Sequence, residues 1–198
     1  MLAMHIRPHP LLAAFAAASL AAGAHAAPVR YEIDPSHTYP SFEADHLNGL
    51  SVWRGKLNSS AGEITLDKEA GTGTVTVRMD AESLDFGLDA MNKAARGDML
   101  FDTAKYPSIT YVGKLVKFVN GAPTAVEGEL RLHGVARPVA LVINSFKCMP
   151  HPMFKREVCG ADALAVIQRD EFGMAAGKDY GFKMDVTLRI QIEAIQAP

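Results

Sequence analysis

Between residues 182 and 194, apolar and polar positions alternate without a break for thirteen residues. The apolar face carries Phe182, Met184, Val186, Leu188, Ile190, Ile192 and Ala194. Side chains repeat every two residues only in a β-strand, so this segment predicts one strand that is buried on one face and hydrated on the other. At about 3.4 Å per residue it would extend for roughly 44 Å, far beyond the usual strand. Such a strand needs an equally long apolar partner surface, made of other side chains or of a bound molecule.

Shorter alternating segments occupy most of the remaining chain. The predicted strands are residues 29–33, 39–46, 52–57, 63–66, 72–79, 108–119, 125–132, 139–146 and 164–170. Turn residues separate them, for example at 59–62 and 178–181. Residues 88–100 differ, because Leu88, Met91, Ala95 and Met99 recur at three- and four-residue spacing. That spacing predicts an amphipathic helix of two or three turns covering one end of the strands.

Eight or nine antiparallel strands, several of them long, favour a closed barrel because closure removes exposed strand edges. The predicted fold is therefore all-β, an elongated eight-stranded antiparallel barrel with a short helical cap, and a β-sandwich is the alternative. An eight-stranded barrel has an interior that side chains can fill or that can hold one small ligand. Periodicity alone does not choose between these two interiors.

The first 26 residues are expected to be a cleaved signal peptide. Residues 11–22 are an apolar run rich in Ala and Leu, and Ala24, His25 and Ala26 have the small-x-small form of a cleavage site. The run is shorter than the about 20 residues that cross a bilayer. The expected domain is thus residues 27–198, exported to a bacterial periplasm.

Charge narrows the classes of partner. Cleavage would remove one of the 20 basic residues, Arg7, and none of the 22 acidic ones, which changes the formal net charge from −2 to −3. A mild negative charge without a basic stripe argues against a nucleic-acid partner and against docking on anionic lipid. No later segment reaches transmembrane length, so stable membrane insertion is not expected. The sequence does not determine the oligomeric state, and a homodimer is one of the possibilities.

The two cysteines, Cys148 and Cys159, lie eleven positions apart. In an oxidising compartment a pair predicts a disulfide. The alternative is a metal site in which His151 joins the two thiolates, but this spacing lacks a nearby fourth ligand. No metal and no cofactor are therefore expected.

The sequence gives little evidence for a catalytic site. Asp45 and His46 are neighbours on a predicted strand and point to opposite faces, so they cannot share a hydrogen bond there. Asp34 and His37 flank a turn in which an Asp more often accepts backbone amides. The patterns of nucleophile elbows, phosphate loops, dinucleotide folds and zinc peptidases are all absent. We expect a protein that is not an enzyme.

Several side chains have both a structural and a binding interpretation. His46 shares the face of Phe42 and Ala44, so it is either a satisfied buried histidine or a polar anchor in an apolar cavity. Arg169 is either paired at the rim or a second anchor. Trp53 is the only tryptophan and is more often a core residue. The methionines suit either gap filling or a tolerant binding surface.

Four segments together resemble the YceI-like polyisoprenoid-binding family. They are residues 31–37 (YEIDPSH, followed by Phe42, His46 and Gly55), 98–111 (DMLFDTAKYPSITY), 127–139 (EGELRLHGVARPV) and 169–174 (RDEFGM). They occur in the family's order and span nearly all of the domain. Thr38 replaces the usual Ser after the first His of the motif, and the Cys148–Cys159 loop is an elaboration that only some relatives share.

The resemblance implies a lipocalin-like barrel that holds a long isoprenoid chain or another amphiphilic lipid, without a reaction of its own. The expected function is non-catalytic transport or storage of a polyprenyl lipid, an isoprenoid quinone or its precursor in the periplasm. A scavenger of hydrophobic small molecules and a structural barrel with a filled lumen are the alternatives. The expected ligand-binding residues are Phe42, His46, Trp53, Met91, Met99, Phe101, Tyr111, Leu130, Leu132, Val166, Arg169, Met174, Phe182, Met184, Val186, Leu188 and Ile190.

Overall fold

The structure is a computed structural model that describes residues 27–198. The expected signal peptide, residues 1–26, lies outside the described residues. The strands are β1 (Val29–Ile33), β2 (Ser41–His46), β3 (Ser51–Leu57), β4 (Ser60–Asp67), β5 (Thr72–Asp80), β6 (Leu84–Asp85), β7 (Ser108–Val116), β8 (Ala125–Leu132), β9 (Val135–Pro150), β10 (Glu157–Gln168) and β11 (Asp185–Gln196). One α-helix, α1 (Asp89–Arg96), and three 3₁₀ turns, η1 (Ala81–Ser83), η2 (Arg169–Phe172) and η3 (Lys178–Tyr180), complete the fold.

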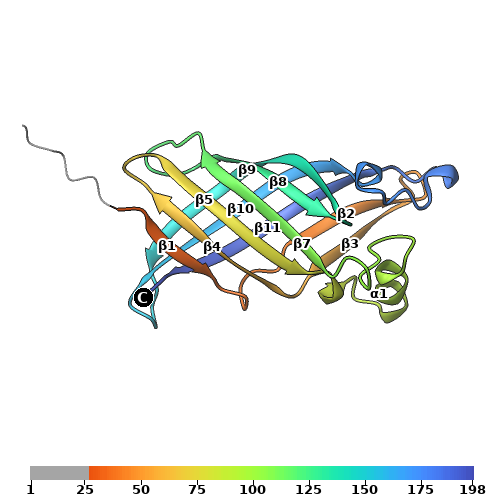
Figure 1. Ribbon diagram of the computed structural model, residues 1–198, viewed down its shortest axis with the longest axis horizontal. Coiled ribbons are helices and arrows are strands. Elements are labelled where there is room, and N and C mark those ends of the chain that lie inside the picture. Colours follow the sequence, from red (N-terminus) through yellow and green to blue (C-terminus); the bar gives the residue numbers. More distant parts are fainter. Residues whose placement is uncertain (1–26) are drawn as a thin grey trace, which may run out of the picture.

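The strands form one closed antiparallel barrel, elongated along its axis (Figure 1). The hydrogen-bonded order β1-β4-β5-β7-β8-β9-β10-β11 closes on itself, because β11 also pairs with β1. The remaining strands extend three of these eight: β2 continues β1 and also pairs with β11, β3 leads into β4, and β6 follows β5. The prediction of an eight-stranded antiparallel barrel with a helix is confirmed.

Element bounds differ from the sequence prediction where a local feature overrides the alternation. The predicted turn at 59–62 is mostly strand, since β4 begins at Ser60 and the chain only bends between β3 and β4. The final strand begins at Asp185 instead of Phe182. Gly177 and Gly181 have positive φ angles of 81° and 84°, and the amide of Phe182 donates to the carbonyl of Gly177, which holds this segment in a turn.

The two hairpin strands around the cysteines are much longer than predicted. Residues 139–146 were expected, whereas β9 runs over sixteen residues, and β10 over twelve. In β10 the face of Cys159 also carries Glu157 and Ala161, and the ladder shifts register between Asp162 and Ala163, so the alternation of large apolar residues is interrupted there. Only residues 151–156 form the connecting loop.

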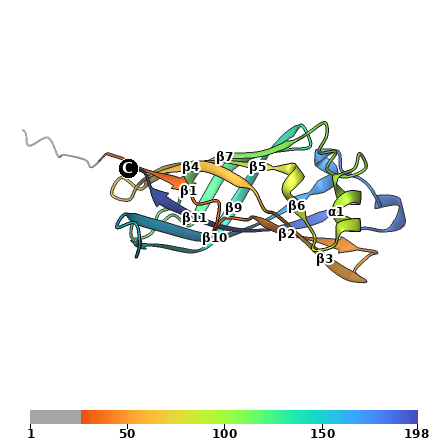
Figure 2. The same cartoon turned by 90° about the horizontal axis from the view of Figure 1, so that it is seen from below.

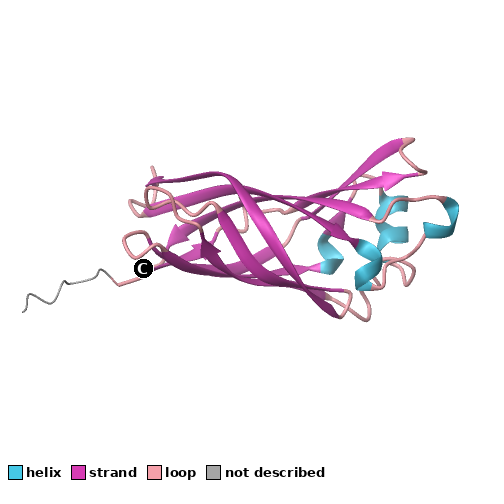
Figure 3. Cartoon of the chain, turned by 90° about the horizontal axis from the view of Figure 1, so that it is seen from above, coloured by secondary structure: helices cyan, strands magenta, loops and turns pink. Residues whose placement is uncertain are grey.

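The helix caps one end of the barrel, which also carries η2, η3 and the β2–β3 hairpin; we call this the helical end (Figures 2 and 3). Asn92 fixes α1 to the chain before it, donating to Asp85 Oδ1 (3.0 Å) and accepting from the amide of Phe86 (2.7 Å). Arg96 donates to the carbonyl of Leu84 (2.8 Å), and Ala95 is fully buried. The helix is shorter than the predicted 88–100, because Gly97 ends it.

Candidate functional site

The interior of the barrel contains a cavity of about 390 Å³ that is lined almost entirely by apolar side chains. Its lining extends from Trp53 and Phe182 at the helical end to Tyr31 and Ala194 near the opposite end. The inward face of β11 follows the cavity along its length with Val186, Leu188, Ile190, Ile192 and Ala194. Strand alternation explains this, since every second residue of each strand points inward. The lumen is thus not filled by the protein's own side chains.

Aromatic side chains gather where the cavity approaches the helical end. Phe42 packs edge-on against Phe86, with ring centroids 5.6 Å apart, and lies 6.0 Å from the ring of Phe101. Met91 of α1 also lines the cavity here. Large flat rings and a flexible thioether present apolar surface without a fixed shape requirement.

Polar side chains along the cavity are already bonded to the protein. The Tyr111 hydroxyl donates to the carbonyl of Val139 (2.8 Å), and burial raises the pKa of Tyr111 to about 12. Thr38 donates to the carbonyl of Glu193 (3.1 Å) and accepts its amide (3.0 Å). Tyr31 donates to Glu157, and burial raises the pKa of that tyrosine as well. The hydrogen bonds of these groups are therefore made within the protein and not with a ligand.

Arg169 is a buried cation at the helical end of the cavity. It is 8% exposed, and it donates to the carbonyls of Met174 and Ala176, at 2.6 Å each. Burial lowers the pKa of its guanidinium, although Asp170 and Asp45 oppose this effect. Within residues 27–198 no carboxylate lies within ion-pair distance of it. Its positive charge is thus held by backbone carbonyls at the edge of an apolar space.

Most of the expected ligand-binding residues line this cavity. These are Phe42, Trp53, Met91, Phe101, Tyr111, Leu130, Leu132, Arg169, Met174, Phe182, Val186, Leu188 and Ile190. Lining residues that the sequence did not single out include Ile64, Leu66, Val75, Val77, Met79, Leu115, Val139 and Leu141. Their alternation along β4, β5, β7 and β9 was visible in the sequence and would have identified them.

Four expected residues do not line the cavity. Met99 is 72% exposed, because the chain turns after Gly97 and brings Leu100 and Phe101 inward instead. Val166 is 62% exposed, since its neighbour Ile167 takes the inward position of β10. Met184 is buried but does not line the cavity, and it lies just before the first residue of β11, Asp185.

His46 is the fourth. Its ring stacks on Trp53, with centroids 4.1 Å apart, and meets the edge of Phe182 at 5.2 Å. Trp53 and Phe182 line the cavity, while His46 lies behind them. Of the two interpretations of His46, the structure agrees with the structural one, since its ring packs on two aromatic rings and is not part of the cavity lining.

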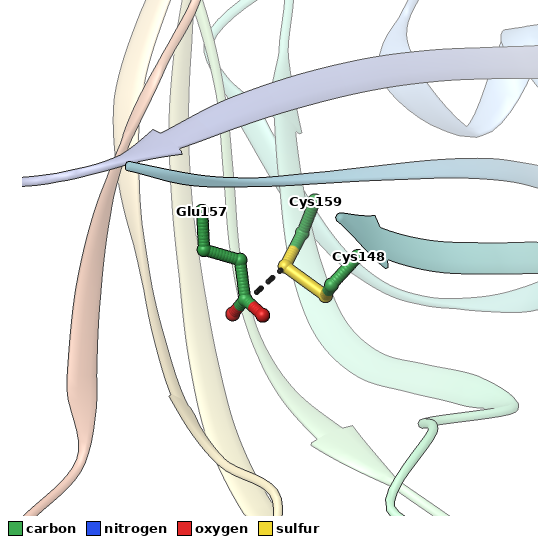
Figure 4. Close-up of side chains that lie close together, drawn as sticks. All are labelled: Cys148, Glu157 and Cys159. Atoms are coloured by element: carbon green, nitrogen blue, oxygen red, sulfur yellow. Dashed lines mark hydrogen bonds between the residues drawn. A yellow bond between two sulfur atoms is a disulfide. The ribbon is translucent and has the colours of Figure 1, made fainter. Parts of the chain in front are cut away.

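At the end opposite the helix, a disulfide joins Cys148 and Cys159, as the sequence predicted (Figure 4). The two residues lie directly opposite each other in β9 and β10, and Cys159 lines the cavity. Glu157 Oε1 lies 3.8 Å from the Cys159 sulfur and accepts a hydrogen bond from Lys68 (2.7 Å). The two sulfurs and His151 do not form the alternative metal site in this structure. The sulfurs are bonded to each other, and His151 Nδ1 accepts the amides of Met153 and Phe154 in its own loop.

The carboxyl of Glu157 is therefore ionised. Partial burial alone would raise the pKa of Glu157, but hydrogen bonds from Lys68 and Tyr31 outweigh it and hold the pKa below its usual range. This polar group ties β1 and the β4–β5 connection to β10 at the end of the barrel.

The candidate catalytic groups form local turn contacts. Asp34 accepts the Ser36 hydroxyl (2.6 Å) and contacts His37 Nδ1 (2.7 Å) in an exposed loop between β1 and β2. Asp45 accepts the amide of Lys183 (3.0 Å) and does not bond to His46. Ser36 Oγ also lies 3.1 Å from His37 Nδ1, so hydroxyl and carboxylate approach the same ring nitrogen, whereas a catalytic relay uses both nitrogens of the ring.

A family model of the YceI-like domain matches residues 31–194. The chain belongs to the YceI-like family. A UPF0312 protein of Shewanella sp. strain MR-4 is 29% identical over 179 residues, which cover 89% of this chain and 88% of that protein. A UPF0312 protein of Vibrio campbellii is 30% identical over 126 residues, or 63% of this chain and 66% of the relative.

Solved structures share the fold of this YceI-like protein. BcnA of Burkholderia cenocepacia has a TM-score of 0.65 at 18% identity, covering 81% of this chain and 98% of the other. A polyisoprenoid-binding domain from Saccharophagus degradans has a TM-score of 0.61 at 18% identity, covering 85% and 99%. The family match and these structures identify the fold as the YceI-like barrel, whose interior here holds the apolar cavity. Among residues 27–198, no helix has the length and hydrophobicity that a membrane crossing requires.

Proposed function

We propose that this protein binds a long-chain isoprenoid lipid, such as a polyprenyl lipid, an isoprenoid quinone or its precursor, and carries or stores it in the periplasm without chemical change. The observation that carries the proposal is the apolar cavity that follows β11 from Val186 to Ala194. Membership of the YceI-like family supports it, as does the polyisoprenoid-binding description of the Saccharophagus degradans neighbour.

A long flexible chain suits this cavity better than a compact polar molecule. The wall offers apolar contact along its whole length, and burial of each CH₂ group contributes about 0.8 kcal/mol. The cavity's polar groups at Tyr31, Thr38 and Tyr111 already have partners within the protein. Recognition then comes mainly from shape and apolar area.

The polar end of the ligand belongs at the helical end. Arg169 places a positive charge there among backbone carbonyls, in a lining that also includes the carboxylate of Asp45. A head group with acceptor oxygens would meet the guanidinium, while the tail extends towards Ala194. This orientation puts the charged and apolar parts of an amphiphile against matching surfaces.

Organic extraction of the purified protein, followed by mass spectrometry, tests the proposal. Recovery of one isoprenoid class supports it. In Leu188→Trp the added ring would occupy the lumen, and we expect uptake of a fluorescent apolar probe to fall by about tenfold or more. Val112→Trp is the matched control, since Val112 is 54% exposed on the outside of β7. Unchanged uptake in a folded Leu188→Trp protein would refute the lumen as the binding site.

A second candidate function is a scavenger of diverse hydrophobic small molecules. The observation in its favour is that the polar atoms of Tyr31, Thr38 and Tyr111 are occupied, which leaves little head-group selection along the cavity. A mixture of unrelated amphiphiles in the extract would favour this function over isoprenoid transport.

A further inference from the structure

The barrel wall carries a second, smaller hollow between β9 and β10. A groove of about 200 Å³ is lined by residues 137–140 of β9, residues 166–168 of β10, and Glu171 and Phe172 of η2. The β9–β10 ladder runs from the pair Glu157 and Pro150 to the pair Leu164 and Val142, and no further. Beyond that point β9 pairs only with β8, and β10 only with β11. The groove therefore lies where two neighbouring strands of a closed barrel are not hydrogen-bonded to each other.

The backbone of β9 shows one reason why the ladder does not resume further along the strand. The amide of Ile143 donates to the carbonyl of Thr124, on the side of β8. Hydrogen-bonding direction alternates along a strand, so Val142, Ala140 and Pro138 direct their backbone groups towards β10. Proline has no amide hydrogen and is found on strand edges for that reason. Pro138 thus makes this part of β9 an edge within the barrel.

Two residues are shared by the lining of the groove and that of the central cavity. Val139 and Ile167 line both hollows, one from each side of the unpaired seam. The carbonyl of Val139 is fixed from the lumen by the Tyr111 hydroxyl. A path from the outer groove to the apolar interior at this place passes these two aliphatic side chains and crosses no β9–β10 ladder hydrogen bond.

Phe172 closes the seam towards the helical end. Its ring is 1% exposed, and it lines the groove from the short turn η2. Nδ1 of His133, in the β8–β9 turn, donates to the carbonyl of Phe172 (3.0 Å), because a carbonyl can only accept. The seam is held there by one aromatic ring and one side-chain hydrogen bond instead of a strand ladder.

We propose that the β9–β10 seam is a lateral entrance through which the tail of an amphiphile passes into the central cavity. This proposal rests on the proposed function, since it concerns the route of the same ligand. The rim carries Arg137, Gln168 and Glu171, so the polar end of an amphiphile can stay hydrated there during passage. Entry through the helical end would instead require a long chain to thread past Trp53, Phe101 and Phe182.

Cross-linking the seam tests the entrance. In the variant Ala140→Cys with Val166→Cys, a short bismaleimide would join the outer faces of β9 and β10. Cys148 and Cys159 are already paired, so the introduced thiols are the only ones that react. The matched control is Val112→Cys with Glu129→Cys, an outward pair directly opposite on β7 and β8, where the ladder is intact.

The probe is cis-parinaric acid, a fluorescent long-chain polyene, followed by stopped-flow fluorescence and by equilibrium titration. We expect the cross-linked seam to slow uptake and release together by about tenfold, with equilibrium affinity unchanged, and the control to match the wild type. Unchanged rates in the cross-linked seam overturn the entrance. Failure of the wild type to bind the probe at equilibrium would instead count against the proposed function.

Phe172→Ala provides a second measurement if the cross-linked protein does not fold. Loss of the ring that closes the seam should speed uptake severalfold. An uptake rate equal to that of the wild type, with affinity preserved, overturns the entrance in this variant as well.

Discussion

Tyr111 of β7 donates a hydrogen bond to the carbonyl of Val139 in β9, 2.8 Å away, and so spans the intervening strand from inside the barrel. The ring crosses β8 over Gly128. A Cβ atom at Gly128 would lie 2.7 Å from both the hydroxyl oxygen and Cζ of the tyrosine, and 2.6 Å from the carbonyl oxygen of Val112. Glycine is required here because of this close approach, not because of its φ angle.

Gly128→Ala should therefore destabilise the barrel by about 1–3 kcal/mol, because a backbone oxygen and a buried ring must both move. The free energy of unfolding in urea measures the effect. Gly160→Ala is the control, since a Cβ there meets its nearest neighbours only at 3.6 Å. Equal stabilities of the two variants would contradict the close packing at Gly128.

Arg169→Lys should weaken the segment between η2 and Gly177. A lysine cannot reproduce the two-pronged geometry with which the guanidinium reaches the carbonyls of Met174 and Ala176. We expect a loss of about 1–3 kcal/mol in the free energy of unfolding. Arg131→Lys, on the exposed face of β8, should leave stability within about 0.5 kcal/mol of the wild type. A neutral Arg169→Lys substitution would show that the two carbonyl contacts contribute little.

Removal of the disulfide by Cys148→Ser with Cys159→Ser should cost about 2–3 kcal/mol, because the bond closes a short loop in the unfolded chain. Thermal unfolding of the variant beside the oxidised wild type measures the loss. Since the two cysteines face each other in an intact ladder, we expect the barrel to remain folded at room temperature. Unfolding at that temperature would show that the disulfide is required for the fold itself.

The stabilising effect of Glu157 should depend on pH. Its pKa is lowered in the folded protein, so its contribution is fully present above the pKa of the unfolded chain, about 4.3, and is lost as the pH falls through the folded value. The stability gap between the wild type and Glu157→Gln should thus shrink between about pH 5 and pH 3. Glu127→Gln, at an exposed position on β8 outside the contact with Lys68, is the control. A gap that stays constant in acid would contradict the ion pair with Lys68.

Much of the fold was predictable because apolar residues alternate along a strand that has one buried face. The segment 125–132 has the bounds of β8, and the inward residues of β11 were all read correctly from Val186 onward. Prediction failed where something other than alternation decides the conformation. Gly177 and Gly181 hold Phe182 in a turn, and a register shift beside small residues interrupts the alternation in the outer parts of β9 and β10.

The site was partly predictable for the same reason. Residues on long strands, such as Leu130 and Leu188, line the cavity as expected, since every second side chain of a strand points into the barrel. His46 and Met99 were misplaced because tertiary contacts and the end of α1 fix their positions, and neither leaves a trace in the local pattern. The β9–β10 seam was missed altogether, because the predicted strand 139–146 began after Pro138, whereas β9 begins at Val135 and includes this proline.

Closure of the barrel joins the two ends of the described chain, because β11 pairs with β1 at one end and with β2 at the other. Residues 31–33 meet residues 194–196, so the last strand of the barrel completes a wall that its first strand begins. Contacts of such long sequence separation form late in folding. A chain that still lacks residues 185–196 is an open trough with two free edges, and it can enclose nothing. Enclosure of any molecule in this barrel must therefore follow the synthesis of its final strand.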